Sequence, residues 1–271
     1  MRTAHHTGLP YGQVDIDYLL SMVRLDDEGH ICLDPKAMRT AEHLLLARYF
    51  DYQQVSFHKT VAAYETLLED VLGILVQSGK LDCSKAKVEK WIAEPGRWIE
   101  FDDAYVTHLL RECGRETKGV DQQKVLALLK RTGPKLIWSR EFFSEQNSNK
   151  KDLALERQIL RSAKDQIADE LNIPSACLWI WSRRTNLTSM GSQVPASRAR
   201  DMAEDEKRAL GESVLIGRAG QKAERIAECE SSLFHALADQ SLANLRMYAL
   251  FPPERVFDRD AAHLAVQRHF P

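Results

Sequence analysis

The chain has 271 residues, enough for one large domain or two small ones. Its hydrophobic content of 44%, charged content of 28% and net charge of -2 are ordinary for a soluble globular protein, and they exclude a bulk attraction to nucleic acid or to an acidic membrane. No apolar run approaches the ~20 residues that a membrane-spanning helix requires, and no signal-peptide pattern opens the sequence. The five cysteines are far apart and odd in number, which disfavours a disulfide framework and indicates a reducing cytoplasm.

The strongest helical pattern extends from Asp34 to Ser78. Asp34 can cap this helix, Pro35 sits where a first-turn proline is tolerated, and Gly79 can end it. Because the pattern far exceeds the usual ~10–14 residues of a helix, we expect a break or kink inside it.

Further helices are predicted at Ser84–Ala93, Asp103–Cys113, Asp121–Arg131 and Lys150–Leu171. Gly114 and Gly133 follow two of them as stop signals. The sequence Asn172-Ile173-Pro174 then breaks the helical pattern.

Beyond this break the sequence favours strands. They are expected at Ala176–Trp181, Val214–Ile216 and Asn244–Phe251, with a helix from Ser231 to Asp239 and a polar surface loop at 189–212. The predicted fold class is therefore mostly α with a smaller C-terminal α+β lobe. The predicted domains are a helical region at 1–171, an α+β lobe at 172–251 and a C-terminal tail at 252–271 with one short helix.

Several runs of sequence resemble HD-domain deoxynucleoside triphosphate triphosphohydrolases. AEHLLLARYFDYQQVSFHKTVAAYETLLEDVL resembles the helix that follows their HD core, where bacterial members read close to ARYFMYxQVYFHKT. TAHHTGLPYGQVDIDYLLSMVRL resembles the segment just beyond the last metal ligand, and WIEFDDAYVTHLLREC the next helix. IAECESSLFHAL and LRMYALF resemble the C-terminal lobe, so the resemblance covers about residues 2–251.

The HD motif itself does not occur in this sequence. The family holds a divalent metal ion with a distant His, an adjacent His-Asp pair and a later Asp, yet the chain has no His-Asp dipeptide. In relatives all four ligands precede the point where this sequence starts, and residues 1–12 read as the continuation of something earlier. The resemblance thus implies the C-terminal portion of an HD phosphohydrolase, inactive alone and without a metal or other cofactor of its own. The pair His5-His6 has no third ligand within reach by spacing.

One helical face carries residues suited to phosphate. Arg48, Tyr52, Ser56 and Lys59 are spaced four, four and three apart, which predicts a shared face. The resemblance assigns Arg48 to substrate phosphate. It also marks two departures, because Ser56 replaces a tyrosine that packs on the deoxyribose and Thr3 replaces an aspartate that binds the sugar. The alternative for Arg48 is a solvated or salt-bridged helix arginine.

The same resemblance implies a regulatory nucleotide site. His58 and Lys59 match a pair that helps to bind an activating nucleotide between subunits, and Arg24 matches an arginine that contacts it. The expected ligand is a guanine nucleotide triphosphate. The alternative is an interfacial histidine beside a lysine whose stem lies along apolar surface.

Two other pairs have structural explanations. Asp102 and Asp103 suit a helix N-cap and a first-turn acid. Trp179 and Trp181 are expected to pack into the core of the lobe or a subunit interface.

Three functions remain open. The first is a non-catalytic HD-phosphohydrolase module that forms a homo-oligomer and binds nucleotide. The second is a subunit of a split enzyme that is completed by an HD-containing chain. The third is an interaction module. A nucleic-acid partner would use the basic residues Arg183, Arg184, Arg198 and Arg200, but the neutral overall charge gives it little support, and no membrane partner is expected.

Overall fold

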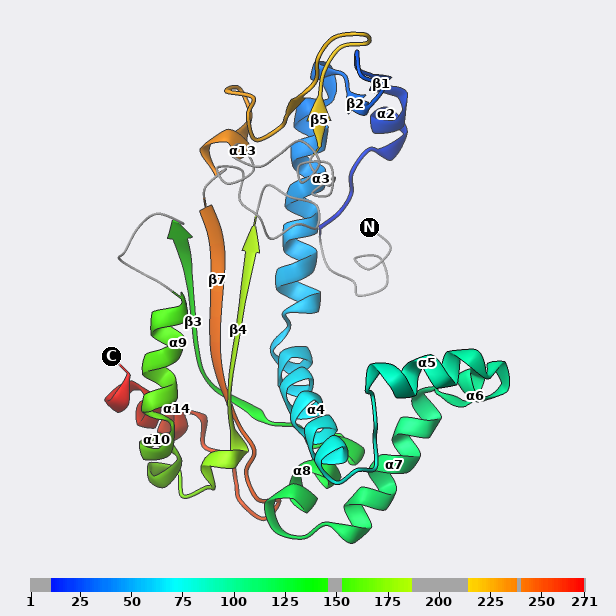
Figure 1. The fold of residues 1–271 in the computed structure, drawn as a ribbon. Helices are drawn as coiled ribbons and strands as arrows, with labels where there is room; N and C mark the ends of the chain where they lie inside the picture. Colours follow the sequence, from blue (N-terminus) through cyan, green and yellow to red (C-terminus); the bar gives the residue numbers. More distant parts are fainter. Residues whose placement is uncertain (1–10, 146–152, 187–213, 238–239, 271) are drawn as a thin grey trace. The chain divides into compact units, whose positions relative to one another are not determined.

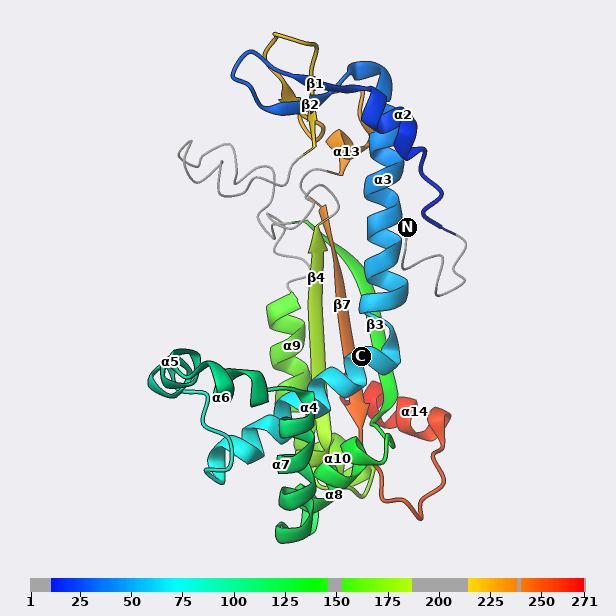
Figure 2. The same ribbon diagram turned by 90° about the vertical axis from the view of Figure 1, so that its right-hand side faces the viewer.

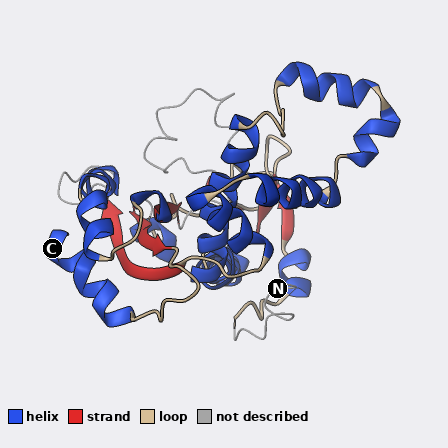
Figure 3. Cartoon of the chain, turned by 90° about the horizontal axis from the view of Figure 1, so that it is seen from below, coloured by secondary structure: helices blue, strands red, loops and turns tan. Residues whose placement is uncertain are grey.

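The computed structural model describes residues 11–145, 153–186, 214–237 and 240–270. Over these ranges the chain is mostly helical with small sheets, which confirms the predicted fold class (Figure 3). Its contacts form two compact units. Unit 1 contains the described parts of Met1–His58, Arg140–Glu156 and Ser182–Leu245, and unit 2 those of Lys59–Ser139, Arg157–Trp181 and Arg246–Pro271. The domain boundaries predicted at 171 and 251 divide the chain differently and are not tested by this grouping. Thr3, His5-His6, Arg198, Arg200 and the predicted loop at 189–212 lie outside the described residues.

Unit 1 begins with elements that the sequence did not predict. Helix α2 (Ile16–Ser21) is capped by Asp15, whose carboxylate accepts a hydrogen bond from the Tyr18 amide at 2.9 Å. A four-stranded sheet then follows the order β1-β2-β5-β6, with strands Val23–Leu25, Ile31–Leu33, Leu215–Ile216 and Glu224–Arg225. Because β2 pairs in parallel with β5, the N-terminal hairpin and a segment far along the chain form one sheet. The short β5 agrees with the strand predicted there.

The long helical pattern is broken, as predicted. Asp34 caps the 3-10 turn η1 (Pro35–Ala37), α3 (Met38–Asp51) follows, and a π-helical turn, η2 (Tyr52–Ser56), comes next. Helix α4 (Lys59–Gln77) then starts in unit 2 and ends before Gly79, whose φ of 70° is one that glycine adopts without strain. The structure therefore places the break at residues 52–58.

Helix α3 is tied to the short helix α13 (Leu233–Ala236) of unit 1. The buried Glu42 carboxylate accepts hydrogen bonds from the Leu233 amide at 2.7 Å and the Ser232 hydroxyl at 3.0 Å. Ser232, rather than the predicted Ser231, caps α13, and the helix stops before the predicted Asp239. Burial opposes ionisation of Glu42, but hydrogen bonds from Arg39 and these donors outweigh it and lower the pKa of the carboxyl.

Unit 2 packs α4 against α7 (Asp103–Glu116) and α8 (Gly119–Leu129) around a buried apolar cluster. Asp102 caps α7 as predicted, but Gly114 does not end it. Gly114 is buried against α8, where an added Cβ would lie 3.3 Å from Val125 Cγ1, so the glycine serves helix packing. Helices α5 (Lys85–Ala93) and α6 (Pro95–Glu100) lie beside the start of α7, away from α8 (Figures 1 and 2).

A three-stranded sheet has the order β3-β7-β4, with strands Lys135–Glu145, Gln240–Ala249 and Leu178–Asn186. The central β7 is antiparallel to both neighbours (Figure 1). Strand β3 was not predicted, although KLIWSREFFSE alternates apolar and polar residues in part. Strands β4 and β7 match the predictions near 176–181 and 244–251, and both extend beyond them.

Three helices complete the description. The helix predicted at 150–171 is divided at Ala163 into α9 (Leu153–Ser162) and α10 (Lys164–Glu170). The predicted tail helix is α14 (Arg259–His269), and α10 packs against it. The turn η3 (Ser175–Cys177) leads into β4.

Both tryptophans of β4 pack in unit 2 against α4. The indole of Trp179 donates to Asp70 Oδ2 at 3.0 Å, and that of Trp181 donates to Glu65 Oε2 at 2.7 Å. Lys124 lies 5.8 Å from the Trp179 ring centroid and forms an ion pair of 2.8 Å with Asp70. The rings are packed against α4, which lies outside the lobe predicted at 172–251, so the predicted packing into the core of that lobe is wrong; each indole N–H has an acidic partner.

Candidate functional site

The predicted phosphate-contacting face is only partly formed. Arg48 donates to Tyr52 Oη at 3.1 Å, and its guanidinium lies 5.3 Å from the tyrosine ring centroid. Ser56 is exposed at the last residue of η2. The prediction that these residues share one helix face with Lys59 is wrong. The π-type hydrogen bond from the Phe57 amide to the Tyr52 carbonyl, 2.7 Å long, ends the helix, and Lys59 starts the next one.

Polar side chains that the sequence did not indicate lie beside η2 and the end of α3. Tyr11 donates to Asp51 Oδ1 at 3.0 Å, and burial together with this carboxylate raises the pKa of Tyr11 to about 12. The Asn244 amide donates to Gln53 Oε1 at 3.4 Å. This region of unit 1 is thus a hydrogen-bonded polar cluster in which Arg48 is held by an aromatic neighbour.

The regulatory residues predicted in unit 1 are Arg24 and His58. Arg24 lies in β1, donates to the carbonyl oxygens of Ser21 and Val23 at 2.9 and 2.8 Å, and has its Nε 3.9 Å from Asp34 Oδ2. His58 is exposed in the link between η2 and α4. Lys59 belongs to unit 2. The joint action of these three residues stays a prediction.

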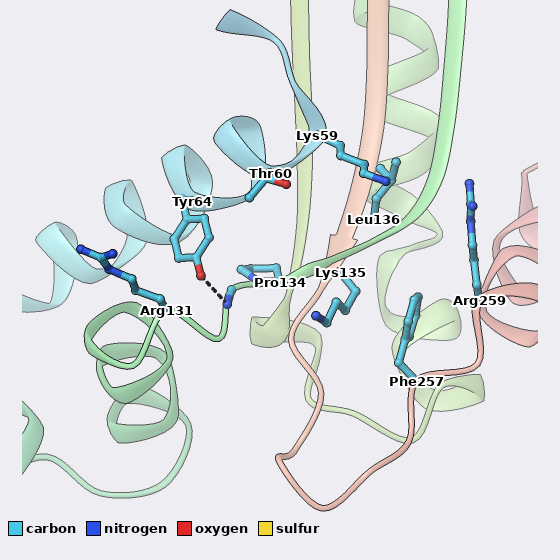
Figure 4. A pocket seen from close by; sticks show the side chains of 10 residues that line it. Lys59, Thr60, Tyr64, Arg131, Pro134, Lys135, Leu136, Phe257 and Arg259 are labelled. Carbon is cyan, nitrogen blue, oxygen red and sulfur yellow. Dashed lines mark hydrogen bonds between the residues drawn. The ribbon is translucent and has the colours of Figure 1, made fainter. Parts of the chain in front are cut away.

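Lys59 lines a cavity of about 370 Å³ that lies within unit 2 (Figure 4). Three segments form it: the first turns of α4, the connection from α8 to β3, and the residues that lead into α14. Below, the name cationic pocket refers to this cavity, lined by Lys59, Thr60, Tyr64, Arg131, Gly133, Pro134, Lys135, Leu136, Phe257 and Arg259.

Four of these lining residues are cations and none is an acid. Across the described parts of the chain, no carboxylate forms an ion pair with any of the four, which are Lys59, Arg131, Lys135 and Arg259. The N-terminus of the 19-residue helix α4 adds positive potential, because its first amides lack intrahelical acceptors. The cationic pocket is therefore suited to an anion with several charged oxygens.

The wall between Arg131 and Lys135 is a fixed turn. Arg131 has a φ of 56°, and the Gly133 amide donates to Tyr64 Oη at 3.0 Å. A Cβ at position 133 would lie 2.7 Å from Tyr64 Cζ, so only glycine fits against the ring. Helix α8 ends at Leu129, and the left-handed residue that follows its end is Arg131, so Gly133 is not the stop signal that the sequence predicted. Tyr64 thereby holds the turn that presents both cations.

The metal ion implied by the resemblance has no counterpart in the structure's described residues. Among 11–145, 153–186, 214–237 and 240–270, no group of three or more His, Cys, Asp or Glu side chains is placed to hold a metal ion. Over the same ranges, no helix combines the length and apolarity of a membrane span.

The family follows from residues 14–204, which match the model of the HD associated region. The match includes more than half of the chain, and the chain belongs to this family. It is 32% identical over 71 residues to the uncharacterized protein YwfO of Bacillus subtilis, covering 26% of this chain and 16% of that protein.

Two solved structures share the fold. A phosphohydrolase from Bacteroides thetaiotaomicron has a TM-score of 0.56 at 18% identity, covering 92% of this chain and 59% of its own. A hypothetical protein from Aquifex aeolicus has a TM-score of 0.58 at 18% identity, covering 98% of this chain and 54% of its own. The chain thus spans little more than half the length of these structures. The predicted relation is confirmed in its coarser part: the chain belongs to the HD associated region family and shares its fold with a solved phosphohydrolase.

The sequence predicted only one residue of the cationic pocket, Lys59. Arg131 and Lys135 flank a Gly-Pro turn, and recognition of the strand after it would have placed both beside a sheet edge. Phe257 comes just before α14, and Arg259 is the first residue of that helix. No local pattern links these two residues to Lys59, so the fold alone brings them into the cavity.

Proposed function

We propose that this chain is the HD-associated portion of a metal-dependent (deoxy)nucleoside triphosphate phosphohydrolase and that its cationic pocket binds the triphosphate of a guanine nucleotide. The observation that carries the proposal is a cavity with four cationic side chains and no acidic one. A triphosphate presents several anionic oxygens, and lysine and arginine are the residues that bind them. The volume of about 370 Å³ falls within the ~300–1,000 Å³ of ligand pockets.

The proposed binding does not include turnover by this chain alone. Hydrolysis in this family uses a divalent metal ion that activates water and neutralises phosphate charge, and no described group of residues is placed to hold one. Arg48, Tyr52 and Ser56 are then residual substrate-phosphate contacts. Lys59 contacts the regulatory nucleotide in the cationic pocket, and the regulatory role of Arg24 and His58, which do not line that pocket, rests on the resemblance alone. The catalytic core would be supplied by HD-containing sequence in the same assembly.

Exposed apolar side chains support assembly with other subunits. On α5 and α6, Ile92, Trp98 and Ile99 are 57%, 46% and 77% exposed. Apolar surface of this kind is commonly buried in a partner. A homo-oligomer or a complex with a complementary HD-containing subunit should appear in light scattering at micromolar concentration. A monomer that binds no apolar dye would contradict this part of the proposal.

Calorimetry with GTP and dGTP tests the nucleotide site. We expect a dissociation constant of tens of micromolar, about -6 kcal/mol, and an affinity about tenfold lower in Lys59→Gln, as for a lost charge-assisted contact. Lys90→Gln is the matched control, because Lys90 is exposed on α5 and does not line the cavity. Absence of binding, or equal affinities in the two variants, would remove the proposal.

A release assay tests the absence of turnover. Purified chain incubated with dGTP and Mg²⁺ or Mn²⁺ should release no triphosphate above the background. Metal-dependent release that Arg48→Ala abolishes would show an active site in this chain.

A further inference from the structure

The residues that lead into α14 form a wall of the cationic pocket that has no assigned role. Phe257 and Arg259 line the cavity together with Lys59. Both lie beyond residues 14–204, the part that matches the family model. The family match therefore gives no role for these two side chains, and their role has to be inferred from their contacts.

Contacts within unit 2 fix the position of Phe257. After β7 the chain turns back, and the ring of Phe257 lies 5.3 Å from that of Phe251, with an interplanar angle of 39°. The guanidinium of Arg255 lies 5.0 Å from the Phe251 ring centroid and donates to the Leu171 carbonyl oxygen. Phe257 is thus supported by a second ring, is only partly buried, and reaches the cavity (Figure 4).

The start of α14 fixes Arg259 in a similar way. The Asp258 carboxylate accepts hydrogen bonds from the amides of Asp260 and Ala261, each at 3.0 Å, and so caps the helix. Arg259 is the first helical residue, and its side chain extends from the segment in the same direction as Phe257 (Figure 4). Its guanidinium has no carboxylate partner among the described residues.

An aromatic ring among cations that have no carboxylate partner suits a ligand that carries both anionic oxygens and a flat aromatic group. Cationic side chains bind phosphate oxygens but do not distinguish a nucleotide from bare triphosphate. A partly exposed phenylalanine adds an apolar face on which any base can stack, with a gain of ~1–3 kcal/mol per base. Phe257 offers such a face with a ring that carries no polar group, whereas the hydroxyl of Tyr64, the other aromatic lining residue, already accepts a hydrogen bond from Gly133.

We propose, on the basis of the proposed triphosphate site, that Phe257 makes the cationic pocket selective for a nucleotide over inorganic triphosphate, and that Arg259 adds a phosphate contact that both ligands share. Phe257 stacks on the base, and Arg259 contacts a phosphate oxygen. Phe257 is then the specificity determinant of the site, and the phosphate contacts of Lys59, Arg131, Lys135 and Arg259 are shared by both ligands.

Calorimetry with dGTP and inorganic triphosphate on the full chain separates these roles. Phe257→Leu should weaken dGTP binding about tenfold, in the range expected for one stacked base, and leave triphosphate binding unchanged. Phe143→Leu is the matched control, because Phe143 is exposed on β3 and does not line the cavity. Arg259→Gln should weaken both ligands about equally, whereas Arg115→Gln, on the exposed surface of α7, should change neither.

The outcomes distinguish the inference from the function on which it rests. If wild type binds neither ligand, the proposed triphosphate site fails. If wild type binds both and Phe257→Leu leaves the ratio of their affinities unchanged, the site stands and the role of Phe257 is overturned. Loss of both ligands in Phe257→Leu, with a lowered melting temperature, would also overturn it, because the ring would then be structural.

Discussion

Two sets of cations in unit 2 have opposite surroundings. Lys124 is buried, with 5% exposure, and both its ammonium group and the Trp179 indole bind Asp70 Oδ2. The four cations of the pocket are drawn together with no carboxylate between them. A lysine that serves the fold has a carboxylate partner, since an unpaired buried charge is costly. The pocket keeps its charges unpaired, which is expected where a ligand supplies the missing anion.

The largest expected difference between these sets is in stability. Lys124→Ala should lower the free energy of unfolding by about 3 kcal/mol, since it leaves Asp70 without its ion pair. Lys135→Ala should change it by less than ~0.5 kcal/mol, as is usual for an exposed residue. Urea denaturation of both variants measures the contrast. Similar losses would show that the pocket cations also serve the fold.

A substitution in the turn between Arg131 and Lys135 should lower the free energy of unfolding almost as much. Gly133→Ala should cost about 2 kcal/mol, because the added methyl group overlaps the Tyr64 ring. Gly73→Ala, in the middle of α4 with open space around it, should instead gain up to ~1 kcal/mol. In a Tyr64→Ala background the cost of Gly133→Ala should largely disappear. If it persists there, the ring does not set the turn.

Glu42 extends the comparison to a buried anion in unit 1. Glu42→Gln should cost about 1–2 kcal/mol at neutral pH, because three donors lose a charged acceptor. The folded-state pKa is lowered from 4.5, so this stabilisation is complete above pH 4.5 and is lost as the pH falls through the folded pKa. Denaturation of wild type and Glu42→Gln should be measured between about pH 3 and about pH 7. The two curves of unfolding free energy against pH should converge in acid. A constant difference would contradict the linkage.

The smallest expected effect is a gain. Lys59→Gln or Arg259→Gln relieves repulsion between like charges and should raise the free energy of unfolding by a few tenths of a kcal/mol, the size usual for exposed charge pairs. Salt at about 0.5 M should abolish the gain, since it screens such charges within several ångströms. Excess triphosphate should reverse the order of stabilities, because wild type binds it better. Destabilisation without ligand would mean that these cations have structural partners.

The sequence revealed what depends on local signals. Helix caps at Asp34 and Asp102, the stop at Gly79 and the need for a break in the long helix were all predictable, because each depends on a few neighbouring residues. The family was predictable from one long run of sequence. The position of the break was not, since a π-helical turn at Tyr52–Ser56 has no simple sequence signature.

Features that depend on distant pairing were missed. Strands β1, β2 and β6 are two or three residues long, too short for a recognisable alternation. The pairs β1–β2 and β5–β6 are local hairpins, and the parallel pairing of β2 with β5 joins these two distant segments. Strand β3 lay in the expected helical region. Lys59 was found through the resemblance, whereas Arg131, Lys135 and Arg259 meet it only through the fold.

The interleaving of the two units limits how this region can be inherited. The chain passes from one unit to the other after His58, Ser139, Glu156, Trp181 and Leu245. A single recombination breakpoint therefore cannot separate one unit intact from the other, and a stop codon before β7 removes strand residues from both units. Two compact bodies in space are one indivisible block in the gene, so a fusion or duplication preserves the fold only when it carries the whole region.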